Sequence, residues 1–550
     1  MKRNKIALAG AALLVAGITA LAGCSSGSNP KSSSDTGSNA NIDPTAIISV
    51  NGSEPQNPLI PTNTNETGGG KILDAMFAGL IGYAADGSVY NDVAESIKVD
   101  DPQHLTVKIR KGVKFTDGTE VKADNFIKAW NYGALASNKQ LSSYFFEDIE
   151  GFVSSDTVYG SEGDLSGLKK VDDYTFTIAL NKPASDFAQR LGYSAYFPLP
   201  DSAFKDMAAF GEHPIGNGPY KLAGADAWQH NVGINLVKNP DYDGPAKAKN
   251  GGLDIKFYAS QDAAYADLTG DQLDVLDAIP DSAFATFESD LGKRAVNQPA
   301  AIFQSFTIPE RLKHFSGEEG QLRRQALSMA INRDEITKVI FQGTRTPASD
   351  FTSPVIDGWS DSLKGADVLK FNEKKAKELW AEADKISPWD GKFQIAYNAD
   401  GGHQAWVDAT VNSIKNVLGI DASGAPYPTF KELRSKVTDR TIQTAFRTGW
   451  QADYPGLYNF LGPLYATNAG SNDGDYSSPE FDKLLSAGIS ATDPKEANAD
   501  YQKAQEVLLK DLPATPLWYS NVVGGFGKKV SNVKFGWNSV PIYSEITKSK

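Results

Sequence analysis

Cysteine and histidine are scarce in this chain of 550 residues, and their scarcity limits its chemistry. Cys24 is the only cysteine, so the chain can form neither an internal disulfide framework nor a thiolate metal cluster. The five histidines are scattered, no two of them lie at metal-ligand spacing, and there is no H-E-x-x-H motif. We therefore expect a protein that is not an enzyme and that needs no metal or cofactor.

Basic residues are outnumbered by acidic ones. The chain has 54 Lys and Arg against 67 Asp and Glu, a net charge of −13. The first 23 residues contain Lys2, Arg3 and Lys5 and no acid, so the remainder has 51 basic residues and a net charge of −16. Phosphate recognition depends on clustered Lys and Arg, which argues against nucleic acid and anionic lipid surfaces as partners. The length exceeds what one core can fill, so two or three domains are expected.

Long hydrophobic runs are also missing, apart from one at the start of the chain. A basic head, residues 1–5, precedes an apolar run, residues 6–21, which is too short for a comfortable membrane span. This layout is typical of an export signal. Its ending, L-A-G-C at residues 21–24, resembles the bacterial lipobox, which implies that Cys24 becomes the lipidated first residue of an exported protein. Residues 25–41 are mostly Ser, Gly and Asn and indicate a flexible tether.

Residues 441–465 combine a strand pattern, a break and many aromatic side chains. The β-branched and aromatic residues at 442–450 predict a strand, and Pro455 and Gly456 end it in a loop. Asp453 is the only carboxylate in this loop, and ligands of open α/β sheets bind at strand ends. We interpret the stretch as a binding wall in which Asp453 anchors a charged ligand. The aromatic residues around Asp453 are Trp450, Tyr454, Tyr458, Phe460 and Tyr465.

The hydrophobic patterns elsewhere predict an α/β protein with an inserted unit. Alternating apolar residues at 105–109 and 174–180 predict strands, and the spacing at 121–135 predicts a helix. Together they make residues 83–207 a small α+β unit. After residue 305 the pattern changes to long helices separated by strands. Composition therefore places breaks near residues 83, 207 and 305.

Several segments, taken together and in order, resemble the solute-binding proteins of peptide and nickel ABC importers, the oligopeptide- and dipeptide-binding family. The matching segments are residues 53–55, 76–80, 105–121, 216–222, 239–242, 323–336 (RRQALSMAINRDEI) and 449–460. The resemblance implies a two-lobed α/β clamp, like that of periplasmic binding proteins, with an extra inserted α+β domain. The implied division is lobe 1 at 42–82, 208–305 and 515–550, the inserted domain at 83–207, and lobe 2 at 306–514.

The resemblance also assigns roles to residues of the predicted wall. Trp450 and Asp453 match the family's W-x-x-D step, whose aspartate accepts the terminal ammonium of a peptide. A carboxylate enclosed between lobes is costly unless a cation pairs with it, and every unmodified peptide brings an α-amine. Arg447 resembles the arginine that helps neutralise the far carboxylate of the ligand. The alternatives are that Asp453 pairs with a neighbouring Arg or Lys and that Arg447 points to solvent.

Two further segments complete the implied site. Asn398 and His403 match a segment near the carboxyl end of longer peptides, although a histidine at a helix start can be structural. Residues 62–66 should form the opposite wall, where an extended ligand could add as a strand. The family has an acidic residue near there, but the local alignment is loose. We include Asn63, Thr64 and Asn65 in the predicted site.

The predicted function is that of a lipid-anchored substrate-binding protein, on the outer face of the cytoplasmic membrane, that captures short peptides and delivers them to an ABC importer. We expect a monomer. One alternative keeps the clamp and binds an oligosaccharide, with Trp450, Tyr454, Tyr458 and Phe460 stacking on sugar rings. Nickel fits poorly with scattered histidines. A surface lipoprotein peptidase and a sensor that reports peptides to a receptor are the remaining alternatives.

Overall fold

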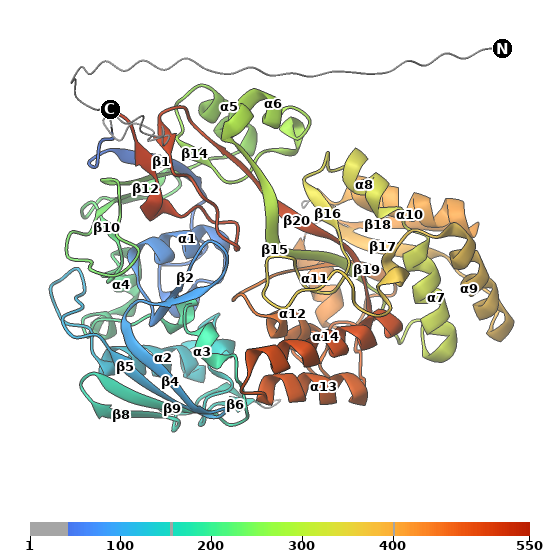
Figure 1. Cartoon of the computed structure of the whole chain (residues 1–550), viewed down its shortest axis with the longest axis horizontal. Coiled ribbons are helices and arrows are strands. Elements are labelled where there is room, and N and C mark those ends of the chain that lie inside the picture. The colour runs from blue at the N-terminus through green and yellow to red at the C-terminus, as the bar shows by residue number, and fades with distance from the viewer. Residues whose placement is uncertain (1–41, 155–157, 400–401, 429) are drawn as a thin grey trace, which may run out of the picture. The chain divides into compact units, whose positions relative to one another are not determined.

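Two long antiparallel strands, β15 (Ala295–Thr307) and β20 (Ala514–Phe526), lie in the middle of the largest sheet (Figure 1). The structure is a computed structural model that describes residues 42–154, 158–399, 402–428 and 430–550. In these residues the largest sheet has twelve strands, ten of them in the order β10-β12-β13-β1-β14-β20-β15-β19-β17-β18. The long pair therefore joins one half of the sheet to the other.

The strands on the β14 side of the long pair form the first half of the sheet. β1 and β13 are parallel, and their inward residues Ile48, Val50, Leu253 and Ile255 are buried, as alternating patterns with one core face require. The strands and helices of this half are β1 (Ile47–Gly52), β10 (Tyr220–Leu222), β11 (Trp228–Gln229), β12 (Gly233–Lys238), β13 (Gly252–Phe257), β14 (Val275–Leu276), α1 (Thr67–Met76), α4 (Met207–Glu212), α5 (Gln261–Thr269) and α6 (Phe287–Leu291).

A separate four-stranded antiparallel sheet, in the order β4-β5-β9-β8, forms within residues 83–207. α2 (Ala123–Ala134) packs on β8, and its Trp130 meets Phe176 of β9 edge-on with ring centroids 5.6 Å apart. The predicted helix and both predicted strands of this unit are thus confirmed. The strands of this sheet are β4 (Ala94–Asp101), β5 (His104–Ile109), β8 (Leu168–Asp172) and β9 (Thr175–Ala179), and nearby elements are β2 (Ile81–Tyr83), β3 (Val89–Asn91), β6 (Val153–Ser154), β7 (Tyr159–Gly160) and α3 (Phe187–Arg190).

The second half of the large sheet is covered by long helices (Figure 1). α10 (Gln404–Leu418) packs on β17 and β18 through Val407, Val411 and Ile414, and it ends at Gly419 in the left-handed conformation. The other elements of this part are α7 (Gly317–Met329), α8 (Arg333–Val339), β16 (Arg345–Pro347), α9 (Glu373–Ile386), β17 (Phe393–Asn398), β18 (Ala422–Tyr427), α11 (Phe430–Thr438), β19 (Ala445–Gln451), α12 (Leu457–Tyr465), α13 (Pro479–Ser490) and α14 (Pro494–Asp511), and the chain closes with β21 (Val530–Ser531) and β22 (Thr547–Lys548).

Some predicted boundaries fall inside elements. The breaks at 305/306 and 514/515 lie within β15 and at the first residue of β20, and the break at 82/83 lies within β2. A strand that runs from one half of the sheet to the other has no change of residue pattern where it crosses, so composition alone does not mark such a boundary. The division into lobes and an inserted domain stays a prediction.

The predicted strand at 442–450 forms as β19, three residues later at its start and one at its end, and the loop after it is followed by α12. Among the described residues, no helix combines the length and apolar character needed to span a membrane. Over the same residues, no group of His, Cys, Asp and Glu side chains is arranged to hold a metal ion. The predicted export signal, Cys24 and the tether lie outside the described residues.

Candidate functional site

A cavity of about 390 Å³ opens beside the end of β19. Its walls come from segments that are far apart in the chain, and they include the loop that carries Asp453, the start of α1 and the segment 536–544. The carboxyl end of a strand is the place where the sequence predicted a ligand site. The lining residues used below are Thr64, Asn65, Glu66, Lys71, Asp74, Tyr83, Asp92, Tyr193, Asp453 and Trp537.

Asn459 fixes the position of Asp453. Its Oδ1 accepts hydrogen bonds from the backbone N–H of Asp453 and from Nε1 of Trp450, both at 3.0 Å. Its Nδ2 donates to Oδ2 of Asp453 at 3.1 Å. Asn459 is 3% exposed in the first turn of α12, where the turn at Pro455 and Gly456 directs the chain back toward β19. One buried amide therefore holds both members of the W-x-x-D step.

Asp453 has no cationic partner among the described residues, because none of their salt bridges includes it. Burial raises the pKa of Asp453 to about 6, and the hydrogen bond from Asn459 offsets only part of that effect. An ionised carboxylate removed from water without a counter-charge is unfavourable. The alternative in which the protein's own Arg or Lys neutralises Asp453 is therefore not what the structure has.

The segment before α1 reaches the same cavity. Thr64 and Asn65 line it, and Oγ1 of Thr64 donates to the carbonyl of Ile60 at 3.0 Å. Glu66 is the N-cap of α1, where its carboxylate accepts the backbone N–H of Gly69 at 2.9 Å. Asn63 ends the 3₁₀-helix η2 (Pro61–Asn63), and its Oδ1 accepts from the backbone N–H of Leu141 at 3.4 Å. Asn63 is not among the cavity-lining residues, so the structure brings only Thr64 and Asn65 of the predicted three to the cavity.

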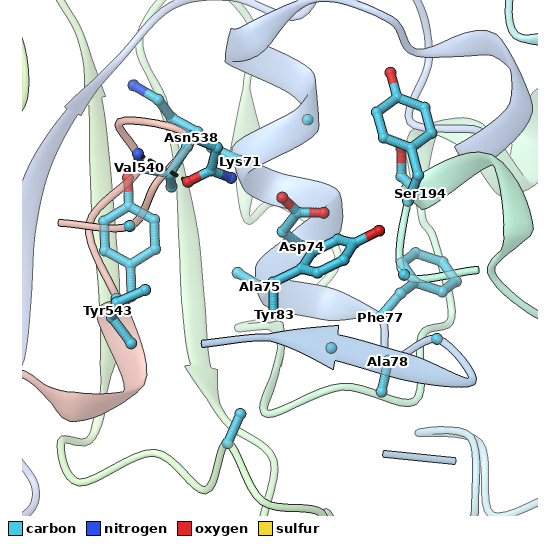
Figure 2. A pocket seen from close by; sticks show the side chains of 18 of the residues that line it. Lys71, Asp74, Ala75, Phe77, Ala78, Tyr83, Ser194, Asn538, Val540 and Tyr543 are labelled. Carbon is cyan, nitrogen blue, oxygen red and sulfur yellow. Dashed lines mark hydrogen bonds between the residues drawn. The ribbon is translucent and has the colours of Figure 1, made fainter. Parts of the chain in front are cut away.

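α1 contributes two charged side chains to the cavity. The ammonium of Lys71 is bound by the carboxylate of Asp277, which also accepts from Nδ2 of Asn51 at 2.7 Å. Asp74 lies one turn further along α1, and Figure 2 shows its carboxylate next to the ring of Tyr83. The enclosing walls raise the pKa of Asp74 to about 7 by displacing water from around the carboxylate.

A second cavity, of about 320 Å³, is lined by Arg447 and Trp450 of β19. Nε of Arg447 donates to Oδ1 of Asn398 at 2.9 Å, so these two predicted residues meet. His403 is elsewhere, at the N-cap of α10, where its Nδ1 accepts from Nε1 of Trp406 at 3.1 Å. His403 lines neither of the two cavities.

Tyr454 differs from the prediction that it contacts the ligand. It is 3% exposed and lines neither cavity. Its hydroxyl donates to Oδ2 of Asp186 at 2.6 Å, and the guanidinium of Arg190 lies 5.5 Å from its ring centroid. Tyr454 therefore packs against Asp186 and Arg190 and not on the cavity that Asp453 lines.

Comparison with known proteins agrees with this arrangement. The profile of the bacterial extracellular solute-binding proteins, family 5 (middle region), matches residues 88–472, which is more than half of the chain. The chain belongs to this family. The family consists of binding proteins and not enzymes, so the predictions of the family and of a non-catalytic role are confirmed.

Curated relatives of this family 5 protein carry peptide-binding names. It is 26% identical over 481 residues to the oligopeptide-binding protein OppA of Bacillus subtilis, covering 84% of this chain and 85% of the relative. It is 27% identical over 491 residues to the periplasmic oligopeptide-binding protein OppA of Salmonella typhimurium, covering 87% of each.

Solved structures share the fold. The periplasmic murein tripeptide-binding protein MppA in its unliganded open form superposes with a TM-score of 0.76 at 21% identity, covering 93% of this chain and 98% of the other. Haemophilus influenzae OppA in complex with RPPGFSPFR superposes with a TM-score of 0.71 at 21% identity, covering 92% of this chain and 100% of the other. The predicted fold class, a two-lobed α/β clamp like that of periplasmic binding proteins, is confirmed.

Sequence reasoning missed most of the surroundings of Asp453. Asn459 could have been noticed, because it is a polar residue in an otherwise apolar helix pattern six residues after Asp453. Asp74, Tyr83, Tyr193 and Trp537 carry no local signal for a shared site, since nothing in the sequence near any of them points to the others.

Proposed function

We propose that this protein captures short peptides in the cavity beside Asp453 and delivers them to an ABC importer. The observation that carries the proposal is the enclosed carboxylate of Asp453, which has a raised pKa and no cationic partner among the described residues. The α-ammonium of a peptide supplies the missing charge whatever the peptide's sequence. Loss of one member of a buried ion pair costs about 3–5 kcal/mol, so this contact alone can decide affinity.

The names of relatives support a peptide as the ligand. Two relatives are named oligopeptide-binding proteins, and a B. subtilis AppA structure with a TM-score of 0.71 is described as a complex with a nonapeptide. In the proposed mechanism the peptide lies along the walls made by Thr64, Asn65 and Asp453, and the two halves of the large sheet close on it by bending near β15 and β20. Main-chain contacts and terminal charges then bind peptides of many sequences.

The remaining predicted residues have supporting roles in this proposal. Arg447, held by Asn398 beside the second cavity, neutralises the carboxyl end of a longer ligand. Asn63 and His403 support the walls through their own hydrogen bonds, and Trp450 keeps Asn459 in place. The same proposal includes the domain division: lobe 1 comprises residues 42–82, 208–305 and 515–550, lobe 2 comprises residues 306–514, and the inserted domain comprises residues 83–207. It also includes a monomeric protein.

Cys24 supplies the proposed attachment to the membrane. Two acyl chains give stable anchoring where one gives only reversible binding. The anchor and the tether at 25–41 keep the binding unit near its permease on the outer face of the cytoplasmic membrane. The relatives' names include periplasmic proteins, which supports an exported location.

An oligosaccharide ligand has less support than a peptide. Of the four aromatic residues that could stack on sugar rings, Tyr454 and Phe460 are buried, with 3% and 0% of their surface exposed. Trp450 already donates its indole N–H to Asn459. A sugar also has no cation to pair with Asp453.

The test is identification of the ligand followed by a charge comparison. The protein is purified without denaturation, and what co-purifies is identified by mass spectrometry. Calorimetry then compares a peptide with its N-acetylated form. We expect co-purified peptides and much weaker binding of the acetylated form. Co-purified oligosaccharide, or equal binding of the two peptide forms, would overturn the proposal.

A further inference from the structure

The cavity beside Asp453 is lined by an excess of negative charge. Its acidic and basic lining residues are Glu66, Lys71, Asp74, Asp92 and Asp453. Lys71 is the only Lys, Arg or His among the residues that line it, and its ammonium is already bound by Asp277, which does not line the cavity. Four carboxylates thus line the cavity, and the one ammonium that lines it, that of Lys71, is already neutralised by Asp277.

Two of these carboxylates have partners within the protein. Oδ2 of Asp92 accepts from the hydroxyl of Tyr242 at 2.7 Å, and its Oδ1 lies 3.9 Å from the guanidinium of Arg110. Glu66 caps α1 and accepts two backbone N–H groups, those of Gly69 and Gln56. Asp92 and Glu66 therefore have partners within the protein and need no ligand to balance their charge.

The other two carboxylates are those of Asp74 and Asp453. Asp453 accepts only the amide of Asn459. Asp74 makes no hydrogen bond or salt bridge to any of the described residues, and its side chain is accessible on the cavity side of α1 (Figure 2). Asp74 therefore offers its carboxylate oxygens to the cavity with no partner among the described residues.

Asp74 and Asp453 act on the same part of the cavity. Tyr83 and Tyr193 both line it. Burial is the main reason that the pKa of each phenol is raised, and the negative charges of both aspartates add to it. The hydroxyl of Tyr83 donates to the backbone carbonyl of Gln189 at 2.8 Å, so it is not available to either carboxylate. The ring of Trp537 meets that of Tyr83 edge-on at 5.5 Å, which adds an aromatic surface between the two acids and the segment 536–544.

We propose that Asp74 is a second anionic subsite of this cavity, which selects peptides that carry a lysine or arginine side chain near their amino end. This inference rests on the proposed function, because it takes the α-ammonium at Asp453 as the first cation. The second cation then pairs with Asp74, while the aliphatic stem and the charge of the side chain lie against the aromatic walls. A cavity with two unpartnered carboxylates and no unpaired cation among its lining residues binds a dicationic amino end better than a monocationic one.

Binding of a basic peptide at Asp74 should be accompanied by the release of a proton. The pKa of Asp74 is raised to about 7 by the displacement of water, so Asp74 holds its proton at higher pH than an ordinary aspartate does. A cation beside it favours the ionised form, so binding of a basic peptide should expel that proton. A peptide with an uncharged side chain at the same place should leave the proton where it is.

The test compares Lys-Ala-Ala with norleucine-Ala-Ala, which has the same aliphatic stem without the ammonium. On the full-length protein at pH 7 we expect calorimetry to show at least about tenfold tighter binding of the lysine peptide. Asp74→Asn should remove this preference by weakening the lysine peptide alone. Asp86→Asn, at an exposed acid outside the cavity, makes the same change in net charge and should keep the preference.

The outcomes separate this inference from the proposed function. If neither peptide binds, the proposed function itself fails. If both bind equally to the unmodified protein, or if Asp74→Asn leaves the preference intact, the second subsite is overturned while the peptide-binding role stands. Should Asp74→Asn not fold, the number of protons released when each peptide binds to the unmodified protein tests the subsite instead. In buffers of different ionisation enthalpy, the lysine peptide should release more protons than the norleucine peptide, and equal release would overturn the subsite.

Discussion

The hydroxyl of Tyr454 donates a hydrogen bond to Oδ2 of Asp186 at 2.6 Å, although 268 residues separate the two in the chain. Arg190 strengthens this contact, because it binds Oδ1 of Asp186 at 2.7 Å and Oδ2 of Asp148 at 2.6 Å. Nε2 of Gln189 also donates to the carbonyl of Pro455 at 2.6 Å. The loop that carries Asp453 is thus bonded on one side to the unit formed by residues 83–207 and faces the cavity on the other.

Tyr454→Phe should loosen this attachment. The substitution removes the hydroxyl and leaves a buried oxygen of Asp186 without its donor, at a cost of about 1–3 kcal/mol in the free energy of unfolding. We expect a lower Tm and a modest loss of peptide affinity, because the loop that positions Asp453 becomes less well fixed. Tyr132→Phe is the control, since the Tyr132 hydroxyl makes no hydrogen bond to any residue that the structure describes. Equal effects of the two substitutions in thermal unfolding would contradict the role of the contact.

Asp453→Asn should weaken the binding of free-amine peptides far more than the binding of N-acetylated ones. The substitution keeps the shape and removes the charge, so a bound α-ammonium is left enclosed without its partner. We expect the dissociation constant of a free-amine peptide to rise at least about 100-fold, which corresponds to about 3 kcal/mol, and that of its acetylated form to change by less than about fivefold. Calorimetry on the peptide pair measures both. Equal losses for the two forms would remove Asp453 from its assigned role.

The same substitution should stabilise the empty protein at high pH. The pKa of Asp453 is raised to about 6 in the folded state, above the ordinary value of 3.8, so its ionisation opposes folding. This destabilisation is absent below about pH 4 and fully present above about pH 6. We therefore expect Asp453→Asn to raise the Tm of the ligand-free protein at pH 8 and to change it little at pH 4. A lower Tm at pH 8 would mean that the carboxylate stabilises the fold through a partner.

Peptide affinity should fall in acid. An ammonium binds only the ionised carboxylate, and protonation of Asp453 competes with binding as the pH drops through about 6. The affinity for a peptide with a single amino-terminal charge should be highest near pH 7 and fall up to about tenfold for each unit below pH 6, with a separate fall above about pH 8 as the α-amine loses its proton. Asp453→Asn should flatten this dependence. A profile that is unchanged in the variant would assign the effect to another group.

Asn459→Ala should disturb both Asp453 and Trp450. The substitution leaves the buried N–H groups of both residues without their acceptor, and each such group costs about 1–3 kcal/mol. We expect a clear fall in Tm together with weaker binding of free-amine peptides. Asn416→Ala, on the exposed face of α10, is the control and should change the Tm by little. Loss of stability without loss of affinity would show that Asn459 supports the helix but not the carboxylate.

Local sequence patterns predicted much of the secondary structure. The helix at 121–135 and the strands at 105–109 and 174–180 appear as α2, β5 and β9 with small shifts, because burial on one face imposes a period on each element. The cap of α8 is likewise local: Oδ1 of Asn332 accepts the backbone N–H of Glu335 at 3.2 Å. Gly68, Gly69 and Gly70 look like a turn in the sequence but lie inside the first turn of α1, since Glu66 caps the helix ahead of them.

The sequence by itself determined that Asp453 follows a strand in an aromatic loop, because residue types and their spacing are local properties. Only the tertiary structure decided which charges meet. In the folded protein Lys71 pairs with Asp277, Tyr454 donates a hydrogen bond to Asp186, and Asp74 and Asp453 line the same cavity. These pairings join segments hundreds of residues apart, and packing between elements selects them, since no local periodicity reports which distant side chain will supply or withhold a counter-charge.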